Sequence, residues 1–179
     1  GKRVYKLACE ADGTRKEITI KDLANRVQCA NEDALQVTQS HSSPISPPPF
    51  MAGAAEVEVD LETGQVELIK FAAAVDCGTP LNENLARVQT EGGLVQGIGM
   101  ALYEDVSYSK DGKVHENSFM QYKVPSRLDV GRVQVEFESS FEPTGPFGAK
   151  SIGEVVINTP SPAIANAVYN AVGVRIREL

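Results

Sequence analysis

Cysteine and histidine are scarce in this sequence, which has three cysteines and two histidines among 179 residues. The cysteines (Cys9, Cys29 and Cys77) are scattered and odd in number, so no disulfide framework is expected and a reducing cytosol is the simplest setting. An iron–sulfur cluster held by thiolates alone needs four cysteines, which excludes such a cluster in this chain unaided. His41 and His115 have no matching ligand cluster, which argues against a zinc site.

Long apolar runs and an excess of positive charge are also missing. No run approaches eighteen apolar residues and no signal-peptide pattern opens the chain. The formal net charge of −7 argues against sequence-independent binding of nucleic acid. A chain of this length can bury a normal core as one domain or two small lobes. We therefore expect a soluble, cytoplasmic protein without nucleic-acid or membrane partners.

Serine and proline are concentrated in residues 38–49. Because proline fixes φ and removes a backbone donor, this stretch is expected to be an extended connector. It divides the chain into an N-terminal segment with its connector, residues 1–49, and a C-terminal lobe, residues 50–179.

The N-terminal segment is expected to form two short strands and a helix. The strands would cover residues 2–7 and 17–20, around a turn at Asp12-Gly13. The helix would follow with Thr19 as its N-cap and with its apolar residues on one face.

The C-terminal lobe contains alternating patterns typical of strands. Residues 56–60 and 66–75, separated by a turn at 62–64, predict a β-hairpin. A second hairpin is expected around residues 110–112, and a further strand at 133–137.

Helices are expected between and after these strands. One would span residues 85–104, and the last would begin with Ser161 as cap and Pro162 as first residue and end near Gly173. Residues 175–179 resemble another strand. Because hairpins and helices are mixed without regular βαβ alternation, we predict an α+β fold with antiparallel sheet and packed helices.

The helix at residues 85–104 carries glycine on one side. Opposite its apolar stripe lie Gln89, Gly92, Gly93, Gln96, Gly97 and Met100. Each glycine inside a helix costs roughly 0.5–1 kcal/mol relative to alanine, so several on one side indicate close approach of a partner. The partner is either a ligand, to which Gln96 would offer its amide, or a tightly packed helix or strand. The pattern leaves both open.

A glycine-rich loop at residues 144–154 ends in Glu154. Its glycines permit unusual φ angles and close contact with a bound group: Gly145, Gly148 and Gly153. Lys150 would either meet an anion or remain a solvated side chain. Glu154, if shielded from water, would act as a general base with raised proton affinity. Alternatively, it simply precedes an apolar turn and favours a helix N-terminus electrostatically.

Taken together, these segments resemble the molybdenum hydroxylase family, which includes xanthine dehydrogenase and aldehyde oxidase. The order and spacing of six segments carry the resemblance: EVEVD at 56–60, ETG at 62–64, EGGLVQGIG at 91–99, YKVP at 122–125, GPFGAKSIGE at 145–154 and PAIANAV at 162–168. It covers residues 50–179 and is weaker before them. Glu83 and Val155-Val156 stand where the family often has proline, and Val88 where it often has glycine.

The resemblance implies that this chain is the C-terminal part of a molybdopterin-binding subunit. Gln96 would hydrogen-bond an oxo ligand of molybdenum, with Gly93, Gly97 and Gly153 beside the cofactor. Glu154 would be the base in the hydroxylation of an aldehyde, a purine or another N-heterocycle with water-derived oxygen. No residue of the chain would bind the metal directly.

The resemblance also implies cofactors and partners. Molybdopterin, in its cytosine dinucleotide form, would be shared with the remaining molybdopterin-binding segments, which would also supply the substrate clamp. The 2Fe-2S clusters and FAD would lie on other chains or domains, an iron–sulfur subunit and often an FAD subunit.

Two other functions stay open from the residues alone. One is a non-catalytic structural module that completes a cofactor-binding subunit. The other, weaker, is a phosphate- or nucleotide-binding domain that uses the loop at residues 145–153, although no Walker-type helix start follows it.

Overall fold

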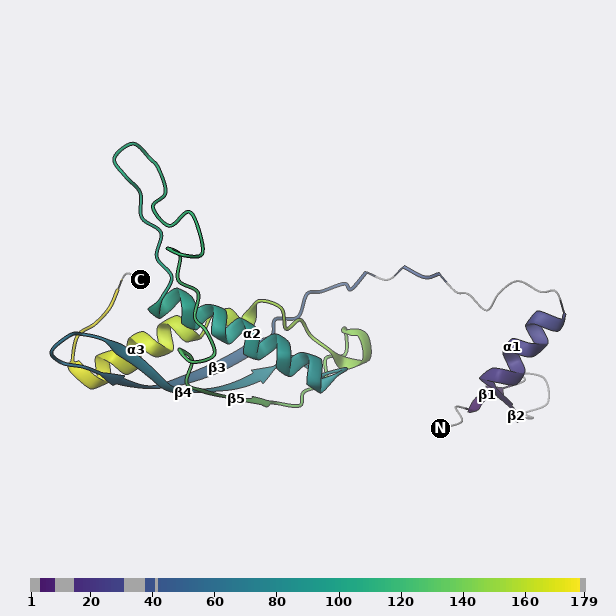
Figure 1. The fold of residues 1–179 in the computed structure, drawn as a ribbon. Coiled ribbons are helices and arrows are strands. Elements are labelled where there is room, and N and C mark those ends of the chain that lie inside the picture. The colour runs from purple at the N-terminus through teal and green to yellow at the C-terminus, as the bar shows by residue number, and fades with distance from the viewer. Residues whose placement is uncertain (1–3, 9–14, 31–37, 41, 178–179) are drawn as a thin grey trace. The chain divides into compact units, whose positions relative to one another are not determined.

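The computed structural model describes residues 4–8, 15–30, 38–40 and 42–177 (Figure 1). The chain forms two compact units, Gly1–Ser42 and Ser43–Leu179. The residues that carry the glycine-faced helix and the glutamate loop all belong to the second unit.

The first unit contains a two-stranded antiparallel sheet and one helix. Strand β1 (Val4–Ala8) pairs with β2 (Arg15–Thr19), and α1 (Ile20–Cys29) follows directly. The Thr19 hydroxyl accepts a hydrogen bond from the Asp22 amide at 3.1 Å, which confirms the predicted N-cap. No residue of α1 is fully buried. The predicted turn at Asp12-Gly13 lies outside the described residues.

The second unit is built on a three-stranded sheet in the order β3-β4-β5. Strands β3 (Phe50–Val59) and β4 (Val66–Asp76) form the predicted antiparallel hairpin, although β3 begins earlier than the alternating pattern indicated. Strand β5 (Arg132–Phe137) joins β4 in parallel. The sheet is therefore mixed, and the predicted antiparallel arrangement is wrong for β5, which returns parallel to β4 after a helical crossover.

Two helices cover one face of this sheet (Figure 1). Helix α2 (Glu83–Leu102) has Asn82 as N-cap, whose side chain accepts from the Leu85 amide at 3.1 Å. Helix α3 (Pro160–Val172) ends at Gly173, whose φ of 75° is the left-handed C-cap conformation that glycine favours. The predicted end of α3 is thus confirmed.

The predicted start of α3 is wrong by two residues. Thr159 occupies the N-cap position and Pro160 is the first helical residue, so the helix contains both Pro160 and Pro162 in its first turn. Proline is tolerated there because the first helical amides have no intrahelical partner. Ser161 instead donates from its hydroxyl to the Gly97 carbonyl at 3.4 Å.

The core lies between the sheet and the two helices. Its buried members come from β4, α2, β5 and α3 and include Leu68, Phe71, Val75, Leu94, Ile98, Val135, Ile164 and Val168. The predicted apolar stripe of α2 therefore faces the sheet, and the α+β fold class is confirmed. None of the described helices is both long and apolar enough to cross a membrane.

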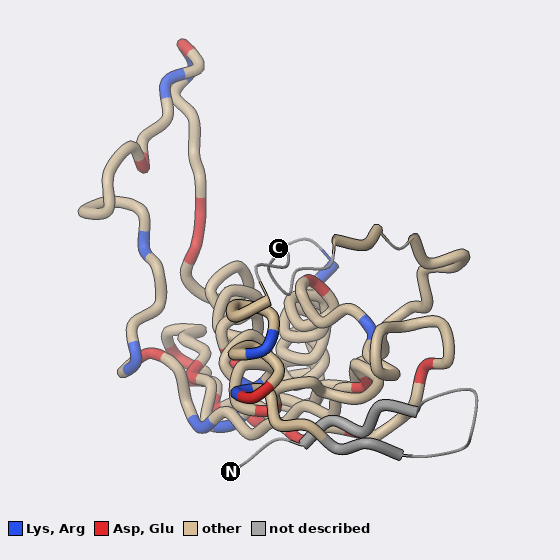
Figure 2. Tube along the Cα trace, turned by 90° about the vertical axis from the view of Figure 1, so that its right-hand side faces the viewer, with Lys and Arg blue, Asp and Glu red and all other residues tan. Residues whose placement is uncertain are grey.

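Residues 103–131 connect α2 to β5 through a long arm that projects from the second unit (Figure 2). The hairpin predicted there is reduced to one isolated antiparallel bridge between Tyr108 and Val114. The Tyr122 hydroxyl donates to the Glu104 carboxylate and ties the arm back to the end of α2. Residues 174–177 form no strand, so the strand predicted at residues 175–179 is wrong over its described part; residues 178 and 179 lie outside the described residues.

Candidate functional site

The glutamate loop is anchored to the end of β4. The Lys150 amide donates to the Cys77 carbonyl at 2.7 Å, and the Thr79 amide donates to the Gly148 carbonyl at 2.8 Å. Gly78 and Ala149 form an isolated antiparallel bridge between the same two segments. The first half of the loop is therefore held as though it were a short extra strand.

A side-chain ion pair reinforces this anchor. Lys150 Nζ lies 2.6 Å from Asp76 Oδ2, and the two side chains are only 10% and 21% exposed. The Ser140 hydroxyl donates to Asp76 at 2.6 Å, and the Gly78 amide donates to it at 3.0 Å. The hydrogen bond from Lys150, followed by those from Ser140 and Gly78, lowers the pKa of Asp76 from 3.8 to about 2.

The two sequence-based expectations for Lys150 are therefore both wrong. Its ammonium group is neither solvated nor available to an external anion, because Asp76 pairs with it and the Phe50 ring lies 5.2 Å away. This pairing also removes the cation that a phosphate site in the loop would use.

The loop reverses direction at Phe147 and Gly148, inside the short 3-10 turn η1 (Pro146–Gly148). Phe147 has φ 54° and Gly148 has φ 83°, so two consecutive residues are left-handed. At Gly148 a Cβ would also lie 2.4 Å from the Phe141 ring. Glycine is required there, and the reversal returns residues 149 and 150 to the end of β4.

The far end of the loop is held by α2. Gln89 Nε2 donates to the Gly153 carbonyl at 3.1 Å, directly before Glu154. Glu154 precedes a second 3-10 turn, η2 (Val155–Ile157), and the Ile157 amide donates to its carbonyl at 3.2 Å. Its side chain is exposed, so the described residues do not provide the shielding from water that the sequence-based hypothesis of a base required, and it does not cap the turn. In the described part of the chain, the Glu154 carboxylate is thus left without a hydrogen-bond partner.

Two of the helix glycines serve packing within the chain. A Cβ on Gly93 would lie 2.2 Å from Val156 Cγ2, and one on Gly97 would lie 2.8 Å from Pro160 Cγ and from the Ile157 carbonyl oxygen. Both glycines are buried. They let η2 and the start of α3 approach α2, so close packing, one of the two explanations left open by the sequence, applies to them.

Two other glycines stay open. A Cβ on Gly92 or on Gly153 would have no heavy atom within 4 Å, and both residues are exposed. Gly92 lies on α2 between Gln89 and Gln96, and both of these glutamines are also exposed. We call the surface formed by Gln89, Gly92 and Gln96 the open strip of α2.

The contact of Gln89 with Gly153 places the end of the glutamate loop against the open strip of α2, to which Gln96 also belongs. Gln96 is two helical turns beyond Gln89 on the same side of α2, a rise of about 10 Å. Gln89 in turn contacts the residue before Glu154. The open strip and the end of the loop therefore adjoin one another on the exposed surface. Gly93 and Gly97, on the same helix, are buried next to the strip.

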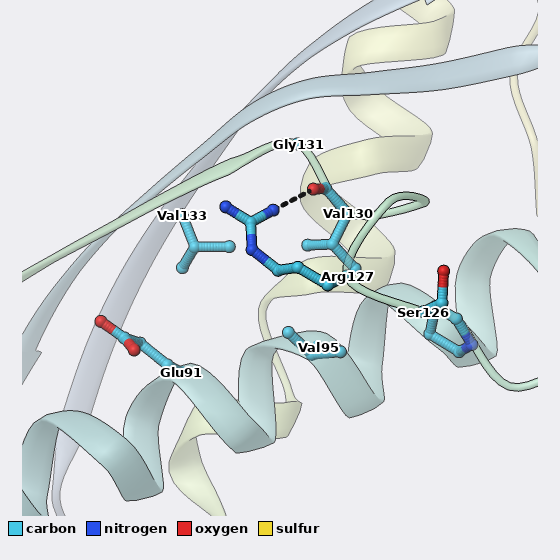
Figure 3. Close-up of a pocket in the computed structure, with 8 residues that line it drawn as sticks. Glu91, Val95, Ser126, Arg127, Val130, Gly131 and Val133 are labelled. Atoms are coloured by element: carbon cyan, nitrogen blue, oxygen red, sulfur yellow. Dashed lines mark hydrogen bonds between the residues drawn. The ribbon is translucent and has the colours of Figure 1, made fainter.

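A separate hollow of about 410 Å³ lies on the other side of α2 (Figure 3). It is lined by Glu91, Val95, Pro125, Ser126, Arg127, Val130, Gly131 and Val133. The Arg127 guanidinium donates to the Val130 carbonyl at 3.0 Å across it. Neither Gln96 nor Glu154 lines this hollow, and both side chains are exposed.

Sequence reasoning missed two residues of this arrangement, Asp76 and Gln89. Asp76 directly follows the strand predicted at residues 66–75 and stands two residues before a glycine, a spacing typical of an aspartate that accepts from the backbone in a turn. Gln89 was placed on the glycine side of the helix without a role. No cluster of three or more metal-ligating side chains occurs within the described ranges.

Comparisons with known proteins identify what this chain is similar to. The sequence profile of the family described as molybdopterin cofactor-binding domain matches residues 3–131. The probable hypoxanthine oxidase XdhD of Escherichia coli is 35% identical over 168 residues, which are 93% of this chain and 18% of that protein. The putative xanthine dehydrogenase molybdenum-binding subunit XdhA of Escherichia coli is 33% identical over 90% of this chain and 22% of its own length.

Solved structures similar to this chain include an enzyme that is also named a dehydrogenase. The CO dehydrogenase from Oligotropha carboxidovorans has a TM-score of 0.78 and 28% identity, over 88% of this chain and 20% of that one. The chain thus spans about a fifth of the length of the proteins it matches.

Proposed function

Because this chain belongs to the molybdopterin cofactor-binding domain family, we propose that it forms one wall of the cofactor site of a molybdenum hydroxylase. The complete enzyme would oxidise an aldehyde, a purine or another N-heterocycle by adding an oxygen derived from water. One observation supports the proposal: Gln89, which lies on the same side of α2 as Gln96, donates to the carbonyl of Gly153, the residue directly before Glu154. The chain is homologous to the large subunits of such enzymes.

The residues present fit a molybdopterin on this surface. The backbone is bare at Gly92 and Gly153, where a Cβ would meet nothing within 4 Å, so a flat ring system can approach closely. The exposed Gln96 side chain offers both an amide donor and a carbonyl acceptor. Gly93 and Gly97 are covered by Val156 and Pro160, so we propose that they support the cofactor wall through packing as well as through their backbone.

When bound, the molybdenum cofactor supplies the two-electron acceptor for oxidation of the substrate. The Glu154 carboxylate takes the proton from the water-derived oxygen that is added to the substrate. It is suited to this role because its backbone is held by neighbours and its side chain is not engaged in capping η2. Gln96 orients the cofactor by hydrogen bonding.

The other parts of the enzyme are proposed from the relatives. A similar protein of Paenarthrobacter nicotinovorans is named a subunit of a dehydrogenase complex, which supports assembly with further chains. We propose the cytosine dinucleotide form of molybdopterin here, and 2Fe-2S clusters and FAD on other chains or domains.

Replacement of Glu154 by Gln in the assembled enzyme tests the proposal. We expect molybdenum content to be retained and turnover to fall by roughly 10²–10⁴, the usual contribution of a general base. Glu91→Gln, a matched change on the other side of α2, should leave turnover unchanged. Full activity of Glu154→Gln would reject Glu154 as the base.

A structural module is the second candidate function. The burial of Gly93 and Gly97 under η2 and α3 favours it, because these glycines have a packing role that needs no ligand. Such a module would tolerate Glu154→Gln, so the same experiment distinguishes the two.

A further inference from the structure

We propose that Gln89 is a positioning residue that fixes the orientation of Glu154 through the Gly153 carbonyl. The inference rests on the proposed function, in which Glu154 is the base. It begins from the contact between Gln89 Nε2 and the Gly153 oxygen, which joins residues 64 positions apart in the sequence at 3.1 Å.

Gly153 does not restrict its own backbone conformation. A glycine has no side chain to restrict φ and ψ, and the Cβ position of Gly153 has no heavy atom within 4 Å. The peptide unit between Gly153 and Glu154 would therefore rotate readily. A hydrogen bond to its carbonyl oxygen is a direct way to fix the plane of that unit, and Gln89 provides this bond.

Glu154 is already fixed on its other side. Its carbonyl accepts from the Ile157 amide at 3.2 Å, and Val156 is fully buried against Gly93 of α2. Upstream, Lys150 is anchored to Cys77 and Asp76. Gln89 therefore holds the backbone between the Lys150 anchor and η2, directly before Glu154, the proposed base.

The contact also links the base to the cofactor residue. Gln89 and Gln96 stand on the same side of α2, a single helix of 20 residues. Since both the cofactor contact and the loop contact come from one rigid element, the spacing between Gln96 and Glu154 is set by the helix. Catalytic groups held by rigid elements keep their productive geometry better than groups on unsupported loops.

Gln89→Glu in the assembled enzyme removes the donor while keeping the length of the side chain. We expect kcat to fall about tenfold, with KM and molybdenum content unchanged, because the base is misplaced and binding is not. Gln89→Ala should give the same pattern if the glutamate variant does not assemble. Val88→Ala, at a neighbouring residue that is 67% exposed, is the control and should leave kcat unchanged.

Hydrogen exchange of residues 151–154 in the same holoenzyme gives a readout apart from activity. Loss of the Gln89 contact should speed exchange there and leave α3 unchanged. Unaltered kcat or unaltered exchange in both Gln89 variants would overturn the inference.

A double variant separates this inference from the proposed function. Gln89→Glu should cause no further loss in an enzyme that already carries Glu154→Gln, since it acts through that carboxylate. Additive losses would reject the inference while leaving Glu154 as the base. A fully active Glu154→Gln enzyme would instead reject the proposed function.

Discussion

The ammonium nitrogen of Lys150 lies 2.6 Å from Oδ2 of Asp76, so the end of β4 and the loop leading to Glu154 are joined by a largely buried ion pair. The partners are 74 positions apart in the sequence. With the backbone bonds at Cys77 and Thr79, the pair fixes where the loop begins.

Asp76→Asn should destabilise the protein in a pH-dependent way. The pKa of Asp76 is lowered from 3.8 in the unfolded chain to about 2 in the folded state. At pH values above 3.8 the ionised carboxylate therefore stabilises the fold. This contribution, at most about 2 kcal/mol, is lost as the pH falls between these two values. Denaturant unfolding at a series of pH values from 7 to 2 measures it.

The difference between wild type and Asp76→Asn in free energy of unfolding should be largest near neutral pH and shrink below pH 4. Asp105→Asn, at an exposed aspartate, should change little and serves as control. If Asp76→Asn lowered the free energy of unfolding by the same amount at every pH, the lowered pKa of Asp76 would not underlie the stability of this anchor.

Gly93→Ala should destabilise the second unit although alanine favours helices. The added Cβ would lie 2.2 Å from Val156 Cγ2, and overpacking of this kind costs about 1–3 kcal/mol. Thermal unfolding followed by circular dichroism measures the loss. Adding Val156→Ala should recover part of it, because the clashing methyl group is removed.

Gly92→Ala is the matched control on the next residue. Its Cβ meets nothing within 4 Å, so the helix should gain up to about 1 kcal/mol from the higher propensity of alanine. If Gly93→Ala proved as stable as Gly92→Ala, the close packing of η2 on α2 would be wrong.

Gln96→Ala should lower molybdenum retention and turnover of the assembled enzyme without loss of stability. Gln96 is exposed, and alanine is a strong helix former, so the fold has little to lose. Metal analysis and turnover compare this variant with Met100→Ala, one turn further along α2 at a residue that is 52% exposed. Equal metal content and turnover in the two variants would count against a cofactor contact at Gln96.

Local patterns in the sequence were enough to predict most of the elements. Alternation in residues 56–60, the turn at 62–64 and the strand-like run at 66–75 predicted the β3–β4 hairpin. The threonine before α1 predicted its cap, because side-chain direction and capping depend on near neighbours. Ser161 failed as a cap because the two nearby prolines allow either of two starting points. The structure starts the helix at Pro160, which is buried beside Gly97 of α2.

The sequence by itself determined the α+β class, the apolar stripe of α2 and the carboxylate at the end of the glycine loop. Only the tertiary structure decided that β5 runs parallel to β4, that Lys150 pairs with Asp76, and that Gly92 is open while Gly93 is covered. A helical wheel puts both glycines on one side, but whether a chain segment lies over them depends on contacts between residues far apart. Those contacts are fixed when the whole core is buried, and no window of neighbouring residues contains them.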